Sequence, residues 1–157
     1  MTFVMTPIGV IRTPFAEGDE IPIQPAFSQA VGQVEVYPEY SEGLQDIEGF
    51  SHIILLYALH RSSGYTLRVK PFLDHHLRGL FATRHPRRPN PIGLSVVQLL
   101  ARRGDMLEVE GVDVLNGTPL LDIKPYVPDF DLKADARGGW YDERPEDGRV
   151  VQPVGQD

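Results

Sequence analysis

The chain has 157 residues, no cysteine and a formal net charge of −7 at pH 7. This length suits a single domain with a real hydrophobic core. The lack of cysteine excludes a disulfide framework, a thiolate zinc site and a cysteine nucleophile. No apolar run approaches the roughly 20 residues that span a bilayer, and the first residues lack a signal-peptide pattern. We therefore expect a cytoplasmic protein with no membrane partner.

Strand patterns recur along the chain as far as residue 126. Residues 31–37 alternate with the period of two that is typical of a half-buried strand. Residues 53–59 form an apolar run short enough for a central strand. A buried helix is the alternative there, but Ile53 and Ile54 favour a strand because β-branched side chains fit a pleated surface. The expected strands are residues 8–13, 31–37, 51–60, 80–83, 92–101, 106–114 and 120–126.

Turn and helix signals complete the fold prediction. Arg103-Gly104-Asp105 is a candidate tight hairpin, and only residues 42–48 have the pattern of a helix. Several short strands with almost no helix favour an antiparallel β-barrel or sandwich. We expect an all-β fold, a small antiparallel β-barrel with short helices. Residues 1–130 would form the barrel domain, and the polar residues 131–157 would form an irregular C-terminal arm.

The densest motif is residues 81–95, Phe-Ala-Thr-Arg-His-Pro-Arg-Arg-Pro-Asn-Pro-Ile-Gly-Leu-Ser. Proline fixes φ and pushes the preceding residue into an extended conformation, so the segment is expected to be a stiff loop. Its guanidinium groups, on Arg84, Arg87 and Arg88, suit a carboxylate or phosphate because they bind such oxygens in bidentate fashion. The alternative is a basic, solvated turn.

Charge is distributed unevenly along the chain. Residues 61–103 contain nine Lys and Arg and one acid, a net charge of +8, whereas the remaining residues contain six basic and 21 acidic side chains, a net charge of −15. One basic segment on an otherwise acidic protein is what an anion-binding face would require. Chance clustering, with the basic residues scattered in space, is the other interpretation.

A second polar motif follows the Asn116-Gly117 turn signal. Asp122, Lys124 and Tyr126 recur with a period of two and should lie on one face of a strand. They are either a functional array of an acceptor, a cation and a phenol, or the solvent face of an amphipathic strand. No metal site is expected, because the adjacent His75 and His76 would point apart and no third ligand is evident.

Four motifs, taken in order, resemble the TrmO family, also known as YaeB-like or TsaA-like proteins. They are residues 8–15, residues 50–52, residues 81–84 with 88–95, and residues 117–119 with 122–126. The resemblance implies a small antiparallel β-barrel that binds S-adenosylmethionine outside the Rossmann group of methyltransferases. It also implies a homodimer that methylates N6 of threonylcarbamoyl-adenosine beside the anticodon of tRNA.

The resemblance assigns the cofactor contacts to four places in the chain. They are the Gln24, Pro25 and Ala26 loop, the His60 and Arg61 pair, Arg84 with Leu94, and the segment of Glu110, Gly111, Val112 and Asp113.

Residue chemistry under this interpretation gives each polar group a role. Methyl transfer is an in-line displacement that depends on positioning. Because the lone pair of N6 is delocalised, a base would help, and Asp122 is the first candidate for the base. Lys124 and Tyr126 would contact a carboxylate or phosphate. Substrate contacts would also come from Arg87, Arg88 and Asn90.

The basic segment would bind the anticodon stem-loop, with Tyr65 and Phe72 as candidate stacking surfaces and Phe81 expected in the core. Two alternatives remain open at this point. The protein could be a barrel that binds an adenosine-type ligand or an RNA loop without chemistry, or a methyltransferase with a different acceptor.

Overall fold

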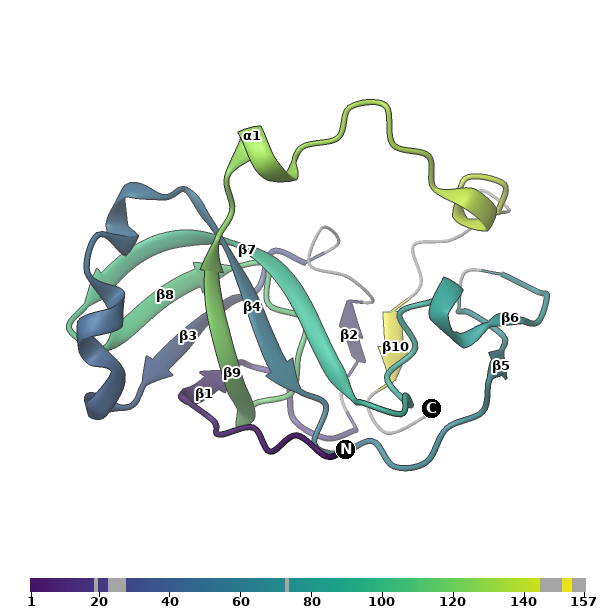
Figure 1. Ribbon diagram of the computed structural model, residues 1–157, viewed down its shortest axis with the longest axis horizontal. Helices are drawn as coiled ribbons and strands as arrows, with labels where there is room; N and C mark the ends of the chain where they lie inside the picture. The colour runs from purple at the N-terminus through teal and green to yellow at the C-terminus, as the bar shows by residue number, and fades with distance from the viewer. Residues whose placement is uncertain (19, 23–27, 73, 145–150, 154–157) are drawn as a thin grey trace.

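The computed structural model describes residues 1–18, 20–22, 28–72, 74–144 and 151–153. Within them, antiparallel strands close a barrel in the order β1-β3-β8-β7-β4-β9 (Figure 1). These strands are β1 (Gly9–Arg12), β3 (Val31–Val36), β4 (His52–Ala58), β7 (Ile92–Arg103), β8 (Met106–Glu110) and β9 (Thr118–Pro125). The barrel closes because β1 pairs with both β3 and β9. The predicted all-β barrel is confirmed.

Side chains along each strand point alternately into and out of the barrel, and the inward ones fill it with apolar groups. In β4, Ile53, Leu55 and Tyr57 point inward and are at most 5% exposed, whereas the residues between them are half-buried. Inward residues of the other strands complete the core, among them Ile11, Val34, Leu107, Val109 and Leu120. Inward and outward positions have a period of two. The sequence of 31–37 displays this period, whereas 51–60 was predicted to be a strand from its apolar run, and both predictions are confirmed.

Two turns of the barrel were also predicted. Gly104, at φ 63°, lies between β7 and β8, whose register ends at the Arg103 and Met106 pair. Gly117, at φ 87°, precedes β9. Both glycines adopt a left-handed conformation that side chains with a Cβ rarely take. β8 stops at Glu110, earlier than the predicted residue 114, because Gly111 at φ 102° turns the chain out of the sheet.

Two element predictions were wrong. Residues 80–83 are not a strand; the 3₁₀ helix η4 (Leu80–Ala82) buries Leu80 and leaves Phe81 74% exposed, so Phe81 is not in the core. The helix expected at 42–48 is replaced by two 3₁₀ helices, η2 (Pro38–Leu44) and η3 (Ile47–Gly49). Asp46, at φ 71°, separates them, and this left-handed residue is incompatible with one continuous helix.

The remaining elements lie outside the barrel wall. A small hairpin joins β5 (Arg68–Val69) to β6 (Arg78–Gly79), and β2 (Glu20–Pro22) pairs with β10 (Val151–Pro153). After α1 (Pro128–Asp131), the chain extends past the barrel to η5 (Gly139–Tyr141), which lies near β6 (Figure 1). There the indole Nε1 of Trp140 donates a hydrogen bond of 2.7 Å to the Ala82 carbonyl. Across the described residues, no helix is both long and apolar enough to span a membrane.

Candidate functional site

The end of β4 and the start of β7 bring two of the predicted cofactor segments together. The Leu59 amide donates a hydrogen bond of 2.8 Å to the Pro91 carbonyl, so the exposed His60 and Arg61 lie beside the end of the arginine-rich loop. Arg61 also faces Glu17, with 3.9 Å between Nη1 and Oε2. The paired strands then continue with Leu56 opposite Leu94.

The segment from Glu110 to Asp113 is fastened to the residues that precede β3. The Gly111 amide donates to the Ala30 carbonyl at 2.8 Å, and the Ser28 hydroxyl donates to the Val112 carbonyl at 2.7 Å. The predicted Gln24, Pro25 and Ala26 contacts lie outside the described residues. Of the residues that follow them in the chain, Ser28 contacts Val112.

A buried chain of hydroxyl groups leads to Asp113. The Tyr57 Oη lies 2.8 Å from the Ser95 Oγ, and Ser95 donates a hydrogen bond of 2.7 Å to Asp113 Oδ1. Tyr57 and Ser95 are 5% and 2% exposed. Tyr57 pairs with Gly93 across β4 and β7, and a Cβ on Gly93 would lie 2.1 Å from the Tyr57 Cε2. Glycine at 93 therefore makes room for the ring whose hydroxyl reaches Ser95.

Burial sets the protonation behaviour of Asp113 and Tyr57. Asp113 is half-buried as a residue, but its carboxyl lies among protein atoms, and this burial raises its pKa to about 7. The Ser95 hydrogen bond and the charge of Arg84 act in the opposite direction. Burial, together with the charge of Asp113, raises the pKa of Tyr57 well above its ordinary value. Tyr57 is consequently a neutral donor at physiological pH, whereas Asp113 can gain or lose a proton.

The arginine-rich loop is braced by one of its own arginines. Arg88 Nη1 donates hydrogen bonds of 2.9 and 3.0 Å to the carbonyls of Thr83 and His85, and its guanidinium lies 5.9 Å from the centroid of the Phe81 ring. Arg84 is exposed and lies close enough to Asp113 and Tyr57 to affect the pKa of both. Arg88 therefore shapes the loop, and Arg84 supplies positive charge beside the buried carboxyl.

The polar array on β9 lies on the outer wall of the barrel. Lys124 Nζ lies 2.9 Å from Asp122 Oδ2, and the two side chains are 60% and 44% exposed. Tyr126, just beyond the strand, contacts the His52 ring edge to face, with 6.2 Å between the ring centroids. The structure therefore brings Asp122 and Lys124 into direct contact, as their spacing predicts.

The register relates this array to the predicted cofactor residues. Leu56 of β4 pairs with Asp122 on one side and with Leu94 on the other. Asp122 and Leu94 therefore belong to one row across three strands, about 10 Å apart at the ordinary strand spacing. Asp113, in contrast, contacts the inward-facing Ser95. The candidate site thus has an outer part on β9 and an inner part at Asp113.

Two residues of the inner part were missed by sequence reasoning. Tyr57 lies within an apolar run, and Ser95 ends a motif whose arginines and prolines drew attention first. No local sequence signal marked Ser95, because its inward position on β7, two residues after Gly93, depends on the strand register. Among the described residues, no group of three or more His, Cys, Asp and Glu side chains could hold a metal ion.

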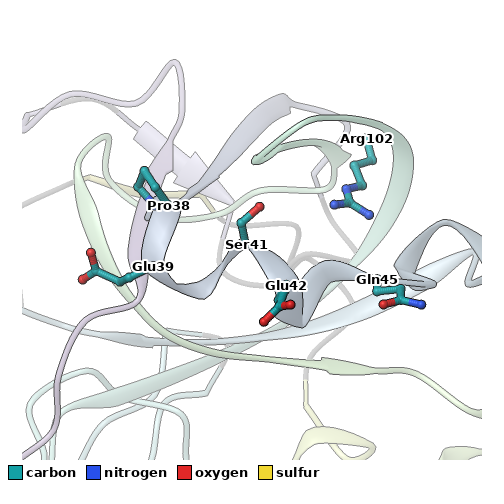
Figure 2. A pocket seen from close by; sticks show the side chains of 6 residues that line it. All are labelled: Pro38, Glu39, Ser41, Glu42, Gln45 and Arg102. Atoms are coloured by element: carbon teal, nitrogen blue, oxygen red, sulfur yellow. The ribbon is translucent and has the colours of Figure 1, made fainter.

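A separate hollow has a volume of about 560 Å³ (Figure 2). It is lined by Pro38, Glu39, Ser41, Glu42, Gln45 and Arg102. Residues 38–49 lie at the opposite end of the barrel from β5 and β6 (Figure 1). Arg102 is bound there by the Leu44 carbonyl and Glu48, so its charge is already used within the fold. None of the predicted site residues lines this hollow.

Comparison with known proteins identifies the family. Residues 10–132 match the family model for the N-terminal domain of tRNA-methyltransferase O. This chain belongs to that family. The TrmO resemblance predicted from the four sequence motifs is therefore confirmed.

Several relatives extend this assignment. A probable S-adenosyl-L-methionine-binding protein of Pyrococcus abyssi is 54% identical over 138 residues, which cover 87% of this chain and 75% of the relative. A tRNA (adenine(37)-N6)-methyltransferase of Homo sapiens is 32% identical over 133 residues, which cover 80% of this chain and 30% of the human protein. The crystal structure of TrmO from Pseudomonas aeruginosa is 43% identical, with a TM-score of 0.74. The similarity covers 88% of this chain and 62% of that TrmO chain, so this chain spans less than two thirds of the solved protein.

Proposed function

We propose that this chain binds S-adenosylmethionine and uses it to methylate N6 of threonylcarbamoyl-adenosine next to the anticodon of tRNA. Membership of the TrmO family and the activities for which its relatives are named support this function. The observation that carries it is the position of Arg84 close enough to the buried Asp113 carboxyl to affect its pKa, with Ser95 of β7 hydrogen-bonded to the same carboxyl. We further propose that the protein acts as a homodimer in the cytoplasm, and that residues 1–130 are the barrel domain and residues 131–157 its arm.

The donor set fits the proposed cofactor. S-adenosylmethionine carries a carboxylate and cationic groups at one end and hydroxyl groups on its ribose. The Arg84 guanidinium suits the carboxylate, and the Asp113 carboxyl suits a cation or a hydroxyl group. The remaining contacts with the cofactor would come from His60, Arg61, Leu94, Glu110, Gly111, Val112 and the loop of Gln24, Pro25 and Ala26. When bound, the cofactor supplies a methyl group that is already activated by its sulfonium.

Catalysis by the protein then consists of positioning the acceptor and removing a proton. Asp122 is the proposed base, because its carboxylate is 44% exposed and lies on the outer wall in the row of Leu94. Lys124, 2.9 Å from this carboxylate, orients it and offers a charge to the threonyl carboxylate of the substrate. Tyr126 is placed against His52 and supplies a phenol at the same wall. Asn90 and Arg87 would contact the acceptor from the loop.

The basic segment is the proposed RNA surface. Recognition of an unpaired base requires phosphate contacts and a stacking surface. Phe81 and Tyr65 are 74% and 53% exposed, and Arg88 lies beside the Phe81 ring. Exposed aromatic rings among arginines provide both kinds of contact, so the affinity for tRNA should fall as the salt concentration rises.

Methyl transfer to defined tRNA tests the proposal. Purified protein and labelled S-adenosylmethionine are incubated with tRNA that carries or lacks the threonylcarbamoyl group, and the methylated nucleoside is identified after digestion. We expect labelled N6-methyl product only from the modified tRNA, and a loss of 100-fold or more in Asp122→Asn. The matched control is Glu39→Gln, which replaces an exposed carboxylate at the far end of the barrel with an amide. This variant should retain full activity.

A binding module is the second candidate, and one observation favours it. The Pyrococcus relative carries a name that refers only to binding of S-adenosyl-L-methionine. Cofactor binding without methyl transfer to either tRNA would support this alternative, whereas transfer to unmodified tRNA would support a methyltransferase with a different acceptor.

A further inference from the structure

The Asp113 carboxyl is held by a series of hydrogen bonds that no sequence motif predicted. Tyr57 comes from β4, Ser95 from β7 and Asp113 from the segment after β8, so three separate parts of the barrel supply one chain of hydrogen bonds. Gly93, which pairs with Tyr57, leaves the space that the ring occupies, because a Cβ at position 93 would overlap it. A buried polar chain is costly compared with apolar packing unless all of its members are satisfied. In the described residues, no buried side-chain nitrogen or oxygen lacks a partner.

The number of available protons sets which group donates and which accepts in this series of hydrogen bonds. When the Asp113 carboxyl is ionised, the Ser95 hydroxyl donates its one proton to Asp113 Oδ1, so it accepts its other hydrogen bond from Tyr57. The order is therefore Tyr57 to Ser95 to Asp113. Both hydroxyl dipoles point their positive ends toward the carboxyl group, which favours its ionised form. The chain ends on Oδ1 and leaves Oδ2 outside this series of hydrogen bonds.

We propose that Tyr57 and Ser95 are positioning residues that fix Oδ1 of Asp113, so that the carboxylate presents its other oxygen to the hydroxyl or cationic groups of S-adenosylmethionine. This inference rests on the proposed function for the identity of the ligand. It adds two residues that act through Asp113 rather than on the ligand, Ser95 by direct contact and Tyr57 through Ser95, and it explains why the motif contains Gly93 and Ser95 together.

Under this arrangement, ligand binding releases a proton from the Asp113 carboxyl. Burial raises the pKa of Asp113 to about 7, so the ligand-free carboxyl is partly protonated near neutral pH. The charged or titratable groups that act on it are Arg84 from the loop and Tyr57 from β4. A ligand that donates a hydrogen bond or brings a cation selects the ionised form. Binding near neutral pH therefore releases part of a proton.

The first experiment measures the carboxyl without ligand. Titration of the Asp113 carboxyl carbon by NMR is carried out in the wild type, in Tyr57→Phe and in Ser95→Thr. We expect a higher midpoint in Tyr57→Phe, because loss of the Tyr57 hydroxyl weakens the stabilisation of the ionised form, and a midpoint close to that of the wild type in Ser95→Thr, which keeps a hydroxyl. The same midpoint in Tyr57→Phe and the wild type would overturn the positioning role, whatever the ligand.

The second experiment measures binding of S-adenosylmethionine by calorimetry at pH 7 in phosphate and in Tris. We expect a buffer-dependent heat in the wild type that disappears in Asp113→Asn, and about tenfold weaker binding by Tyr57→Phe, the ordinary loss for a hydrogen bond in a charged network. The matched control is Tyr37→Phe, which removes an exposed hydroxyl outside the barrel core and should change neither quantity. A shifted NMR midpoint together with no binding by the wild type would reject the ligand and the proposed function but leave the Tyr57 to Asp113 coupling established. Equal affinity and equal proton release in Tyr57→Phe and the wild type would reject the inference itself.

Discussion

The guanidinium of Arg78 lies 6.0 Å from the centroid of the Trp140 ring, and this contact joins η5, in the proposed C-terminal arm, to the hairpin that precedes the arginine-rich loop. The same indole donates its N–H to the Ala82 carbonyl. Two contacts at one side chain therefore connect residues 139–141 to residues 78–82, about 60 positions earlier in the chain.

Trp140→Leu should release the arm. Loss of one hydrogen bond and one cation–π contact should lower the free energy of unfolding by about 1–2 kcal/mol and increase amide exchange at residues 78–82. Hydrogen exchange with mass spectrometry measures the second effect directly. Phe130→Leu on α1, where the ring is 72% exposed, is the control and should leave exchange in the hairpin unchanged. Unchanged exchange in Trp140→Leu would mean that the arm does not restrain the hairpin.

Gly93→Ala should destabilise the barrel by about 1–3 kcal/mol, the usual cost of forcing an extra carbon into a packed core. The new Cβ would be 2.1 Å from the Tyr57 ring, so the ring and its hydroxyl must move. Urea unfolding measures the loss. Gly43→Ala is the matched control, because no atom lies within 4 Å of the added Cβ there. The double variant Gly93→Ala with Tyr57→Ala should be less destabilised than the sum of the single changes; simple additivity would contradict the clash.

Asp74 should make the stability depend on acid pH. Its buried carboxylate lies 2.5 Å from Arg78 Nε and 3.2 Å from His76 Nδ1, and the Arg78 hydrogen bond holds the pKa of Asp74 well below its ordinary value of 3.8. Because the pKa is lower in the folded state than in the unfolded state, the stabilisation is complete above about pH 4 and is lost as the pH falls below it.

Replacement of this carboxylate provides the test. Asp74→Asn should be less stable than the wild type at pH 7, and the difference should shrink as the pH falls from 4 to 2, as measured by urea unfolding at several pH values. A difference that stays constant over this range would show that the carboxylate contributes through its shape rather than its charge.

Phe81→Ala should weaken tRNA binding without affecting the fold. A base stacked on an aromatic ring contributes about 1–3 kcal/mol, so the dissociation constant should rise by about tenfold or more. The melting temperature should hardly change, because the ring is 74% exposed. Phe3→Ala removes a ring that is 78% exposed elsewhere in the chain and is the control for binding measured by filter retention or fluorescence anisotropy. Equal affinities for the two variants would remove Phe81 from the RNA surface.

Much of the barrel could be predicted from the sequence because its strands are short alternating or apolar runs bounded by turn residues. The β4 run from Ile53 to Tyr57 and the Gly104 hairpin are local patterns, and local patterns determine strand positions and turns. Phe81 shows the limit of this reasoning. Its apolar side chain suggested burial, but the 3₁₀ turn at Leu80 buries the neighbouring residue and directs Phe81 outward.

The candidate site was only partly predictable for a related reason. The contact between Asp122 and Lys124 follows from their spacing on one strand. The contact between Ser95 and Asp113 depends on how β7 lies against the segment after β8, and no local pattern encodes that relationship. Family resemblance supplied Asp113 as a candidate, whereas Tyr57 and Ser95 became visible only from the strand register.

The pairing of β1 with β9 also has a consequence for biosynthesis. Residues 9–12 leave the ribosome more than 100 residues ahead of the strand that covers their second edge. At about 5–20 residues per second, that interval lasts on the order of 5–20 s. During this time β1 can pair only with β3, and its open edge is available to neighbouring nascent chains. Its shortness, four residues, limits how long a foreign strand can remain bound there.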